Sequence, residues 1–153
     1  MFRGTVQLKL DDKGRIAIPA KYRERLREQC GGRLVVALGI DAKTNKEEPY
    51  LMVYPAPVWE DVEARVNQLP STSKQVQSFK RRLIGNAEDC DMDAQGRVSL
   101  PARLREKVGI DREVDLIGQG NKFELWDRET WAQENSEPEI VGELPAELAS
   151  FSF

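Results

Sequence analysis

The sequence predicts an α+β fold, mainly β, in which two similar units form one pseudo-twofold barrel with flanking helices. First, residues 11–26 (DDKGRIAIPAKYRERL) and 93–108 (DAQGRVSLPARLREKV) are identical at seven of sixteen positions without a gap. Second, each copy combines short strand patterns with a tight turn and a short helix. Third, four short strands per copy are too few to bury both faces of a sheet. The two copies should therefore fold against each other.

The first copy begins with a predicted hairpin. Val6, Leu8 and Leu10 alternate with polar residues, which is typical of a half-buried strand. Asp11 and Gly14 suit a tight turn, because Asp bonds forward to the backbone and Gly accepts a positive φ. The returning strand, a helix, a second hairpin and a second helix follow. They comprise RIAI (15–18), a helix from Pro19 to Gly31, strands LVVALG (34–39) and YLMVY (50–54), and a helix over 58–69.

The second copy repeats this order. VVALG (35–39) corresponds to VDLIG (114–118), and VYPAPVW (53–59) corresponds to LWDRETW (125–131). The connection at 40–49 is seven residues longer than its counterpart, which leaves the geometry of that hairpin open. We expect a first unit at 1–69 (core 5–58), a connector at 70–86 with a helix over 73–84, a second unit at 87–131 and an acidic tail at 132–153, where Leu144, Leu148 and Phe151 could form a last turn.

Composition excludes several classes of function. The chain has 153 residues and no histidine, which removes His-based nucleophile systems and His-ligated zinc. The two cysteines, Cys30 and Cys90, form no CxxC motif and fit a reducing cytosol better than a disulfide framework. Apolar runs are too short to span a membrane, and the charged N-terminus does not read as a signal peptide. We expect a cytoplasmic protein without cofactor or small-molecule substrate.

Charge is segregated along the chain. The formal net charge is −3, but residues 1–27 hold eight Lys or Arg against three Asp or Glu, and residues 74–107 hold eight against five. Residues 108–153 hold three against eleven. Such segregation allows a positive surface on an acidic protein, as nucleic-acid binding requires.

The second copy begins with a short acidic run that has part of a calcium-binding pattern. The run DMDAQG resembles the start of an EF-hand loop, with Asp91, Asp93 and Gln95 as candidate ligands. Position twelve of that loop should be Glu, but it is Ala102 here, preceded by Pro101. A magnesium nuclease would need further carboxylates from elsewhere. We expect no metal.

The repeated arginines are the strongest functional candidates. Arg15 and Arg97 each follow a turn glycine, where folding needs no guanidinium. We expect them to project from loop tips, oriented by Asp11 and Asp93, and to read guanine edges or grip phosphate. Arg23 and Arg105 recur too, and could instead pair with Glu across subunits. The Lys80-Arg81-Arg82 run is expected to be a solvated face, and Trp59 and Trp131 to be core or interface anchors.

The repeated pattern Asp-x-Lys-Gly-Arg-(apolar)-x-(apolar)-Pro-x-x-x-Arg resembles the DNA-binding module of the SpoVT–AbrB superfamily of swapped-hairpin β-barrels. Two such modules, an opening MFRG and a closing GxxNKFELW are similar to the MraZ family of bacterial transcriptional regulators over about residues 1–131. This resemblance implies a ring-shaped homo-oligomer that binds short direct repeats in double-stranded DNA.

The resemblance further implies repression of the division and cell-wall gene cluster, including the protein's own gene, and association with the nucleoid. The DNA-binding residues expected here are Arg3, Lys9, Asp11, Lys13, Arg15, Asp93 and Arg97. Gln95 stands where the first copy has Lys13, so the second turn should bind phosphate more weakly. Three alternatives stay open: an AbrB-like antitoxin-type regulator, a carboxylate metal-dependent nuclease, and a purely structural ring.

Overall fold

A computed structural model of the chain describes residues 1–136 and 145–153. Its first half contains β1 (Thr5–Lys9), β2 (Arg15–Ala17), α1 (Ala20–Cys30), β3 (Leu34–Asp41), β4 (Lys46–Pro55) and α2 (Ala56–Asn67). Its second half contains α3 (Lys74–Leu83), β5 (Glu88–Asp89), β6 (Arg97–Ser99), α4 (Ala102–Val108), β7 (Glu113–Gly118), β8 (Phe123–Asp127), α5 (Arg128–Ser136) and α6 (Ala146–Ala149). This mixture of α and β follows the predicted order. The expected connector helix is α3, and it is capped by Ser73, whose hydroxyl accepts a hydrogen bond from the Val76 amide.

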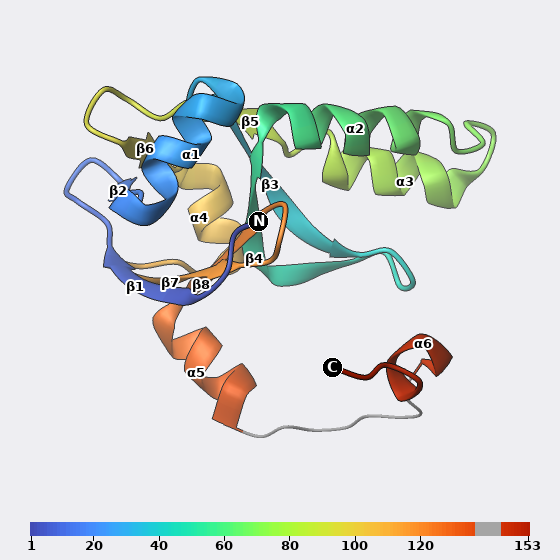
Figure 1. The fold of residues 1–153 in the computed structure, drawn as a ribbon. Helices are drawn as coiled ribbons and strands as arrows, with labels where there is room; N and C mark the ends of the chain where they lie inside the picture. Colours follow the sequence, from blue (N-terminus) through green and yellow to red (C-terminus); the bar gives the residue numbers. More distant parts are fainter. Residues whose placement is uncertain (137–144) are drawn as a thin grey trace.

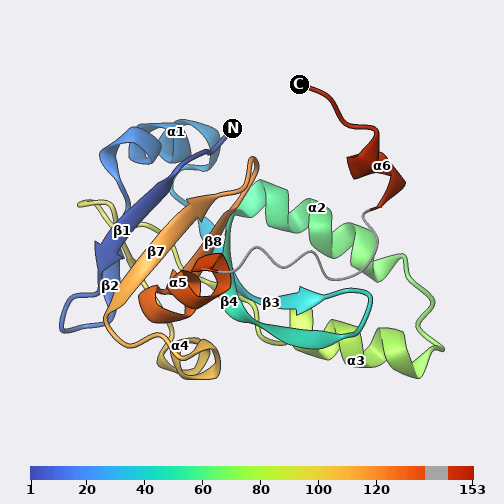
Figure 2. The same ribbon diagram turned by 90° about the horizontal axis from the view of Figure 1, so that it is seen from below.

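The strands form an antiparallel six-stranded sheet of order β1-β7-β8-β4-β3-β5 and a separate antiparallel pair, β2-β6 (Figures 1 and 2). Among the described residues, hydrogen bonding does not close the large sheet, because β1 and β5 are its two edges. The sheet therefore does not show the closed barrel that the sequence predicts.

The two copies are related by a pseudo-twofold axis that can be located from strand register. In β2-β6, Ile16 lies opposite Val98, its own counterpart in the repeat. In β4-β8, Met52 lies opposite Glu124, again its own counterpart. A residue that pairs with its own equivalent lies on the axis, so the axis passes through both ladders. Each copy thus contributes half of the β2-β6 pair, and neither copy can form it alone.

Pairing also corrects the alignment of the third strands. Leu34 opposes Pro55, and Val114 opposes Asp127, so Leu34 rather than Val35 corresponds to Val114. Helix α1 has 11 residues and α4 has 7, whereas the link to the next strand is shorter after α1. The second copy is therefore two residues shorter between the helix start and the third strand (Ala102 to Val114 against Ala20 to Leu34), and the sequence match of 35–39 with 114–118 was one residue out of register. One consequence is that Asp115 occupies the position of Val35 on the outer side of the sheet.

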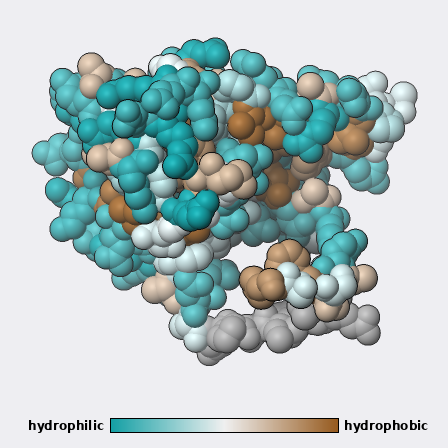
Figure 3. Space-filling model, in the orientation of Figure 1, coloured by the Kyte–Doolittle hydropathy of each residue, from teal (hydrophilic) through white to brown (hydrophobic). Residues whose placement is uncertain are grey.

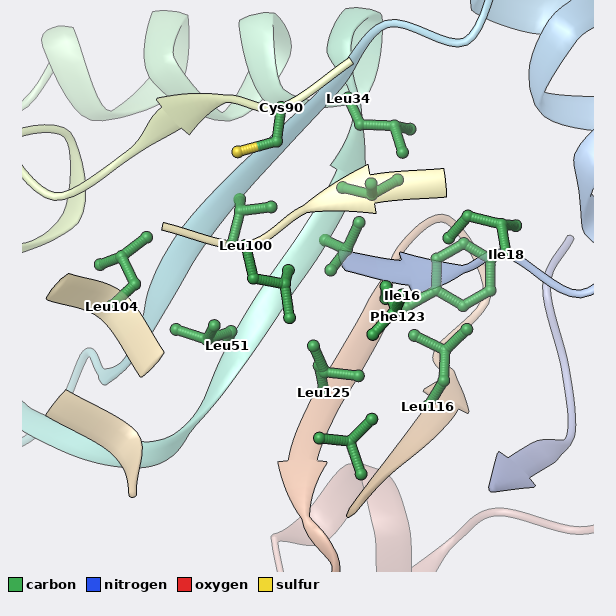
Figure 4. Close-up of a cluster of buried hydrophobic side chains, with 14 of the residues drawn as sticks. Ile16, Ile18, Leu34, Leu51, Cys90, Leu100, Leu104, Leu116, Phe123 and Leu125 are labelled. Carbon is green, nitrogen blue, oxygen red and sulfur yellow. The ribbon is translucent and has the colours of Figure 1, made fainter. Parts of the chain in front are cut away.

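The main core lies between the large sheet and the layer made by β2, β6, α1 and α4 (Figure 4). Side chains from both copies meet there, including Ile16, Leu51, Leu104 and Leu125, none of which is exposed to solvent. Phe123 is also fully buried, with its ring centroid 4.5 Å from that of Phe2. Burial at this junction joins the copies into one folding unit.

A second apolar cluster lies on the other face of β3 and β4, beneath α2 and α3. It contains Val35, Trp59, Val66 and Leu83, with Phe79 packed against it. In the space-filling view, apolar side chains gather around α2 and α3, while most of that face is hydrophilic (Figure 3). The apolar faces of these two helices therefore cover the outer face of the sheet.

The long hairpin of the first copy is also supported by α3. The Nδ2 of Asn45 donates to the hydroxyl of Ser78 at 3.0 Å, and a guanidinium nitrogen of Arg82 donates to the Asn45 carbonyl. Arg82 therefore has a structural contact, whereas Arg81 is exposed as expected of a solvated face.

Helix α5 ends the second copy and has no counterpart of α3 beside it in the described residues. Trp131, half-buried, packs on Trp126 with ring centroids 5.3 Å apart, while its counterpart Trp59 is buried. No described helix is long and apolar enough to cross a membrane. Leu144 of the predicted last turn lies outside the described residues, and α6 follows at Ala146–Ala149.

Candidate nucleic-acid interface

The first repeated turn is built around one carboxylate. Asp11 Oδ1 accepts the amides of Lys13 and Arg15, both at 2.9 Å, and Gly14 takes a φ of 74° that L residues rarely adopt. The Gly14 amide donates to the Asp11 carbonyl at 3.0 Å, which closes the turn. The backbone amide of Arg15, then its side chain, holds the pKa of Asp11 below the usual value. Asp11 therefore stays ionised and fixes the turn.

Arg15 is held by the same carboxylate. Its Nε donates to Asp11 Oδ2 at 2.7 Å, and its side chain is 22% exposed. Asp11 therefore orients the arginine, as predicted. The side chain folds back against the turn, however, and does not project freely from the loop tip as the sequence predicts. Among the described residues, its Nη1 and Nη2 have no hydrogen-bond partner. The arrangement leaves the end of the guanidinium, two parallel donors, available for a ligand.

The second turn reproduces this geometry with one difference. Asp93 Oδ1 accepts the amides of Gln95 and Arg97, and Arg97 Nε donates to Asp93 Oδ2 at 2.9 Å. The pKa of Asp93 is likewise lowered, first by the backbone amide of Arg97. Arg97 Nη2 also donates to Gln95 Oε1 at 3.2 Å. Gln95 thus removes a positive charge, relative to Lys13, and also engages part of the guanidinium.

The β2-β6 pair brings both arginines to one side of the molecule. Ile16 and Val98 face the core, so Arg15 and Arg97, one residue away, face solvent together. They occupy diagonal positions of the ladder, since Arg15 opposes Ser99 and Arg97 opposes Ala17. The two turns extend side by side from the same end of the molecule (Figures 1 and 2). This end is hydrophilic in the space-filling view (Figure 3).

The other residues predicted to bind DNA lie at different distances from the two turns. Lys13 is exposed within the first turn. Lys9 lies at the base of that turn, but its ammonium forms an ion pair with Glu113 at 3.7 Å. Arg3 precedes β1, ~20 Å along an extended strand from Lys9, where its carbonyl accepts from the Tyr22 hydroxyl. The structure therefore separates Arg3 from the turns.

Sequence reasoning left three residues near the turns unassigned or ambiguous. Arg23 and Arg105 make no ion pair with any described carboxylate of their own chain, and pairing with Glu across subunits stays a prediction. Each donates to a backbone carbonyl of its own copy and lies against the turn glycine of the other copy. Arg27 donates to the Ala94 carbonyl in the second turn at 2.9 Å. For Arg23 and Arg105, repetition was the only signal in the sequence, and it did not reveal their contacts with the opposite copy; Arg27 is not repeated and gave no signal.

No group of three or more His, Cys, Asp or Glu side chains that could hold a metal ion occurs among residues 1–136 and 145–153. Asp91, a candidate ligand in the EF-hand comparison, instead accepts from the Leu34 amide at 3.3 Å. Asp11 and Asp93 are engaged by their own arginines and by the backbone of their turns.

Comparison with known families gives an independent assignment. The family described as "MraZ protein, putative antitoxin-like" matches this chain twice, over residues 1–82 and 83–141. The chain belongs to the MraZ family. The resemblance inferred from the repeated turn is thereby confirmed, and the two matches follow the two copies.

Similar proteins support the same assignment over almost the whole length. A transcriptional regulator MraZ of Nitrosomonas europaea is 47% identical over 154 aligned positions, covering 99% of both chains. Relatives of the same name from Thioalkalivibrio sulfidiphilus and Pseudomonas aeruginosa are 47% and 46% identical, covering 90% and 86% of this chain and 87% and 83% of theirs. MraZ proteins carry the name of regulators rather than enzymes, which favours the regulator reading over the nuclease.

Proposed function

We propose that this MraZ protein is a sequence-specific DNA-binding regulator of transcription, without catalytic activity, that contacts DNA through its two repeated turns. The observation that carries the proposal is the β2-β6 ladder, which turns two carboxylate-oriented arginines, Arg15 and Arg97, to one face. With Nε engaged, Arg15 presents both of its Nη atoms, whereas Arg97 presents Nη1 and shares Nη2 with Gln95. Such a fork matches guanine O6 and N7 or two phosphate oxygens.

The roles of the other residues follow from their positions. Lys13, exposed beside Arg15, would bind phosphate, and Asp11 and Asp93 would orient the arginines without touching DNA. Lys9 would contribute less, because Glu113 competes for its charge. Arg3 would contact DNA only if the duplex followed β1 away from the turns. The pairing of β2 with β6 supports a single-chain swapped-hairpin arrangement, in which units 1–69 and 87–131 complete each other across the connector.

We further propose that the protein acts in the cytoplasm at the nucleoid, on short direct repeats upstream of its own gene, and represses the division and cell-wall gene cluster there. A closed homo-oligomeric ring would present the turns repeatedly on one side. Binding sites would then recur about 10 to 10.5 bp apart, or at multiples of that spacing. Head-to-tail closure is supported by the unequal outer faces of the copies, one covered by α2 and α3 and the other carrying α5. A monomer at micromolar concentration in light scattering would refute the ring.

Among the alternatives, an antitoxin-type regulator would need a C-terminal segment devoted to a toxin. Most of the second half is instead a unit that packs with the first around Phe123 and Leu104. A carboxylate nuclease would need a cluster of metal-binding carboxylates, and Asp11 and Asp93 are already bonded to Arg15 and Arg97.

The proposal is tested by a gel shift with DNA from immediately upstream of the gene and with a scrambled duplex, at two salt concentrations. The parent should bind the upstream DNA more tightly, and the Arg15→Ala/Arg97→Ala variant should lose this preference. Arg65→Ala is the matched control, because Arg65 forms the same Asp-to-Arg pair at a spacing of four residues, with Asp61, on the remote helix α2. Equal binding of both duplexes by the parent, or loss of DNA binding in the control, would contradict the proposal.

A further inference from the structure

We infer that Arg23 and Arg105 are positioning residues, each of which holds in place the DNA-binding turn of the opposite repeat. The inference rests on the proposed function, and the two can fail separately. Neither arginine is in a turn. Both lie near the start of a helix, Arg23 in α1 and Arg105 in α4.

Arg23 closes a circuit of contacts with the second turn. The Ile18 amide donates to the Gly96 carbonyl at 2.8 Å, which ties the end of β2 to the second turn. The Ile18 carbonyl then accepts Nε and Nη2 of Arg23, at 3.1 and 2.9 Å. The side chain of Arg23 returns to Gly96, where a Cβ would overlap its Cδ and Nε. Arg23 thus covers the turn glycine while bonding the strand residue that holds it.

Arg105 forms the equivalent circuit with the first turn. The Leu100 amide donates to the Gly14 carbonyl at 3.0 Å, and the Leu100 carbonyl accepts Nε of Arg105 at 3.2 Å. A Cβ on Gly14 would lie 2.8 Å from Arg105 Nη2. Two sets of residues 82 positions apart therefore make the same cross-repeat contact, which argues against a coincidence of side-chain packing.

The circuits have a physical reason. The Ile18 and Leu100 carbonyls precede prolines at the helix starts, outside the helical hydrogen bonds, and a carbonyl removed from water needs a donor. A guanidinium can satisfy it and still lie flat against a glycine, whereas a Lys ammonium offers no planar fork. Any side chain at Gly14 or Gly96 would displace the arginine. Glycine is therefore required at each turn for two reasons: the backbone has a positive φ, and a Cβ would overlap the arginine of the opposite repeat.

The two turns are not held equally. Helix α1 is four residues longer than α4, and its Arg27 adds a bond to the Ala94 carbonyl in the second turn. The position equivalent to Arg27 in the second copy is Gly109, the residue that ends α4. The second turn is thus braced by two arginines and the first by one. The turn with fewer charges is the more firmly held.

The first experiment is hydrogen exchange on the free, full-length protein, which needs no DNA. Arg23→Ala should speed exchange of the Gln95 and Arg97 amides more than that of the Lys13 and Arg15 amides. Arg105→Ala should do the reverse. Arg23→Lys keeps the charge and should protect the second turn poorly. Equal effects on both turns, or no effect on either, would overturn the inference.

The second experiment is a double-mutant cycle on binding to the upstream DNA. If Arg23 acts through Arg97, Arg23→Ala should cost no more affinity than Arg97→Ala. Adding it to Arg97→Ala should then cost less than about twofold, because coupled residues are non-additive. Adding it to Arg15→Ala should multiply the two losses.

A full multiplicative loss with Arg97→Ala, together with rescue by Arg23→Lys, would mean that Arg23 contacts DNA by charge, and the inference would be wrong. If the parent fails to bind the upstream DNA, the proposed function falls, and the exchange experiment still decides the positioning role.

Discussion

Replacement of Arg15 by alanine tests the link between turn geometry and DNA recognition. Arg15 Nε is taken by Asp11, so the ligand meets two Nη donors of fixed orientation. A bidentate contact of this kind contributes about 1–3 kcal/mol, or about 5- to 150-fold in affinity. In an oligomer every subunit loses the contact, so the measured loss should lie toward or above the upper value. Arg97→Ala should cost less, because Gln95 already occupies one of its Nη atoms.

The fold should survive this change. The Asp11 carboxylate keeps its bonds to the Lys13 and Arg15 amides, which belong to the backbone. We therefore expect the unfolding midpoint to fall by no more than about 2–4 °C. Arg65→Ala removes an equally spaced Asp–Arg pair far from the turns and should leave DNA affinity unchanged.

Fluorescence anisotropy across a salt series, with operator and scrambled duplexes, separates two modes of contact. If Arg15 reads a base, its loss should reduce the preference for operator. If it binds phosphate, both duplexes should weaken equally and the slope of log affinity against log salt should fall by about 1 per contact. An Arg15→Ala protein that stays folded and binds operator as tightly as the parent would refute the mechanism.

Three further results are expected. Lowering the pH from 5 toward 3 should destabilise the protein, because the pKa values of Asp11 and Asp93 are lower in the folded state than the unfolded value of 3.8. The stability that they contribute is present above the unfolded pKa and is lost as the pH falls through the folded pKa. The thermal midpoint of Asp11→Asn/Asp93→Asn should depend less on pH than that of the parent, and an unchanged slope would contradict this. Burial raises the pKa of Cys90 to about 11, so iodoacetamide at pH 8 should label it only after denaturation, as peptide mass mapping would reveal. Phe123→Ala should cost about 3–5 kcal/mol in urea unfolding, because a fully buried ring joining both repeats is lost; a cost under about 1 kcal/mol would show that the core collapses around it.

The repeated sequence was sufficient for the local parts of this protein. Asp11, Gly14 and Pro19 dictate a turn, a left-handed glycine and a helix start through the conformations of single residues and their nearest neighbours. The same residues recur in the second copy, so both turns and their arginines could be predicted. Helix α3 could be predicted over 73–84 from the helical spacing of its apolar residues, and the structure gives Ser73 as its cap.

Only the tertiary structure decided how these parts meet. Arg23 resembles a solvated helix residue in the sequence, but it braces a glycine 73 positions away, through contacts that no local pattern encodes. The outward position of Asp115 could not be predicted because the sequence match of 35–39 with 114–118 is one residue out of register with the strand pairing, and a shift of one residue moves a side chain to the other face of a strand. Pairing of β2 with β6 depends on burial shared between the copies, and this burial sets the positions of Arg15 and Arg97 on one face.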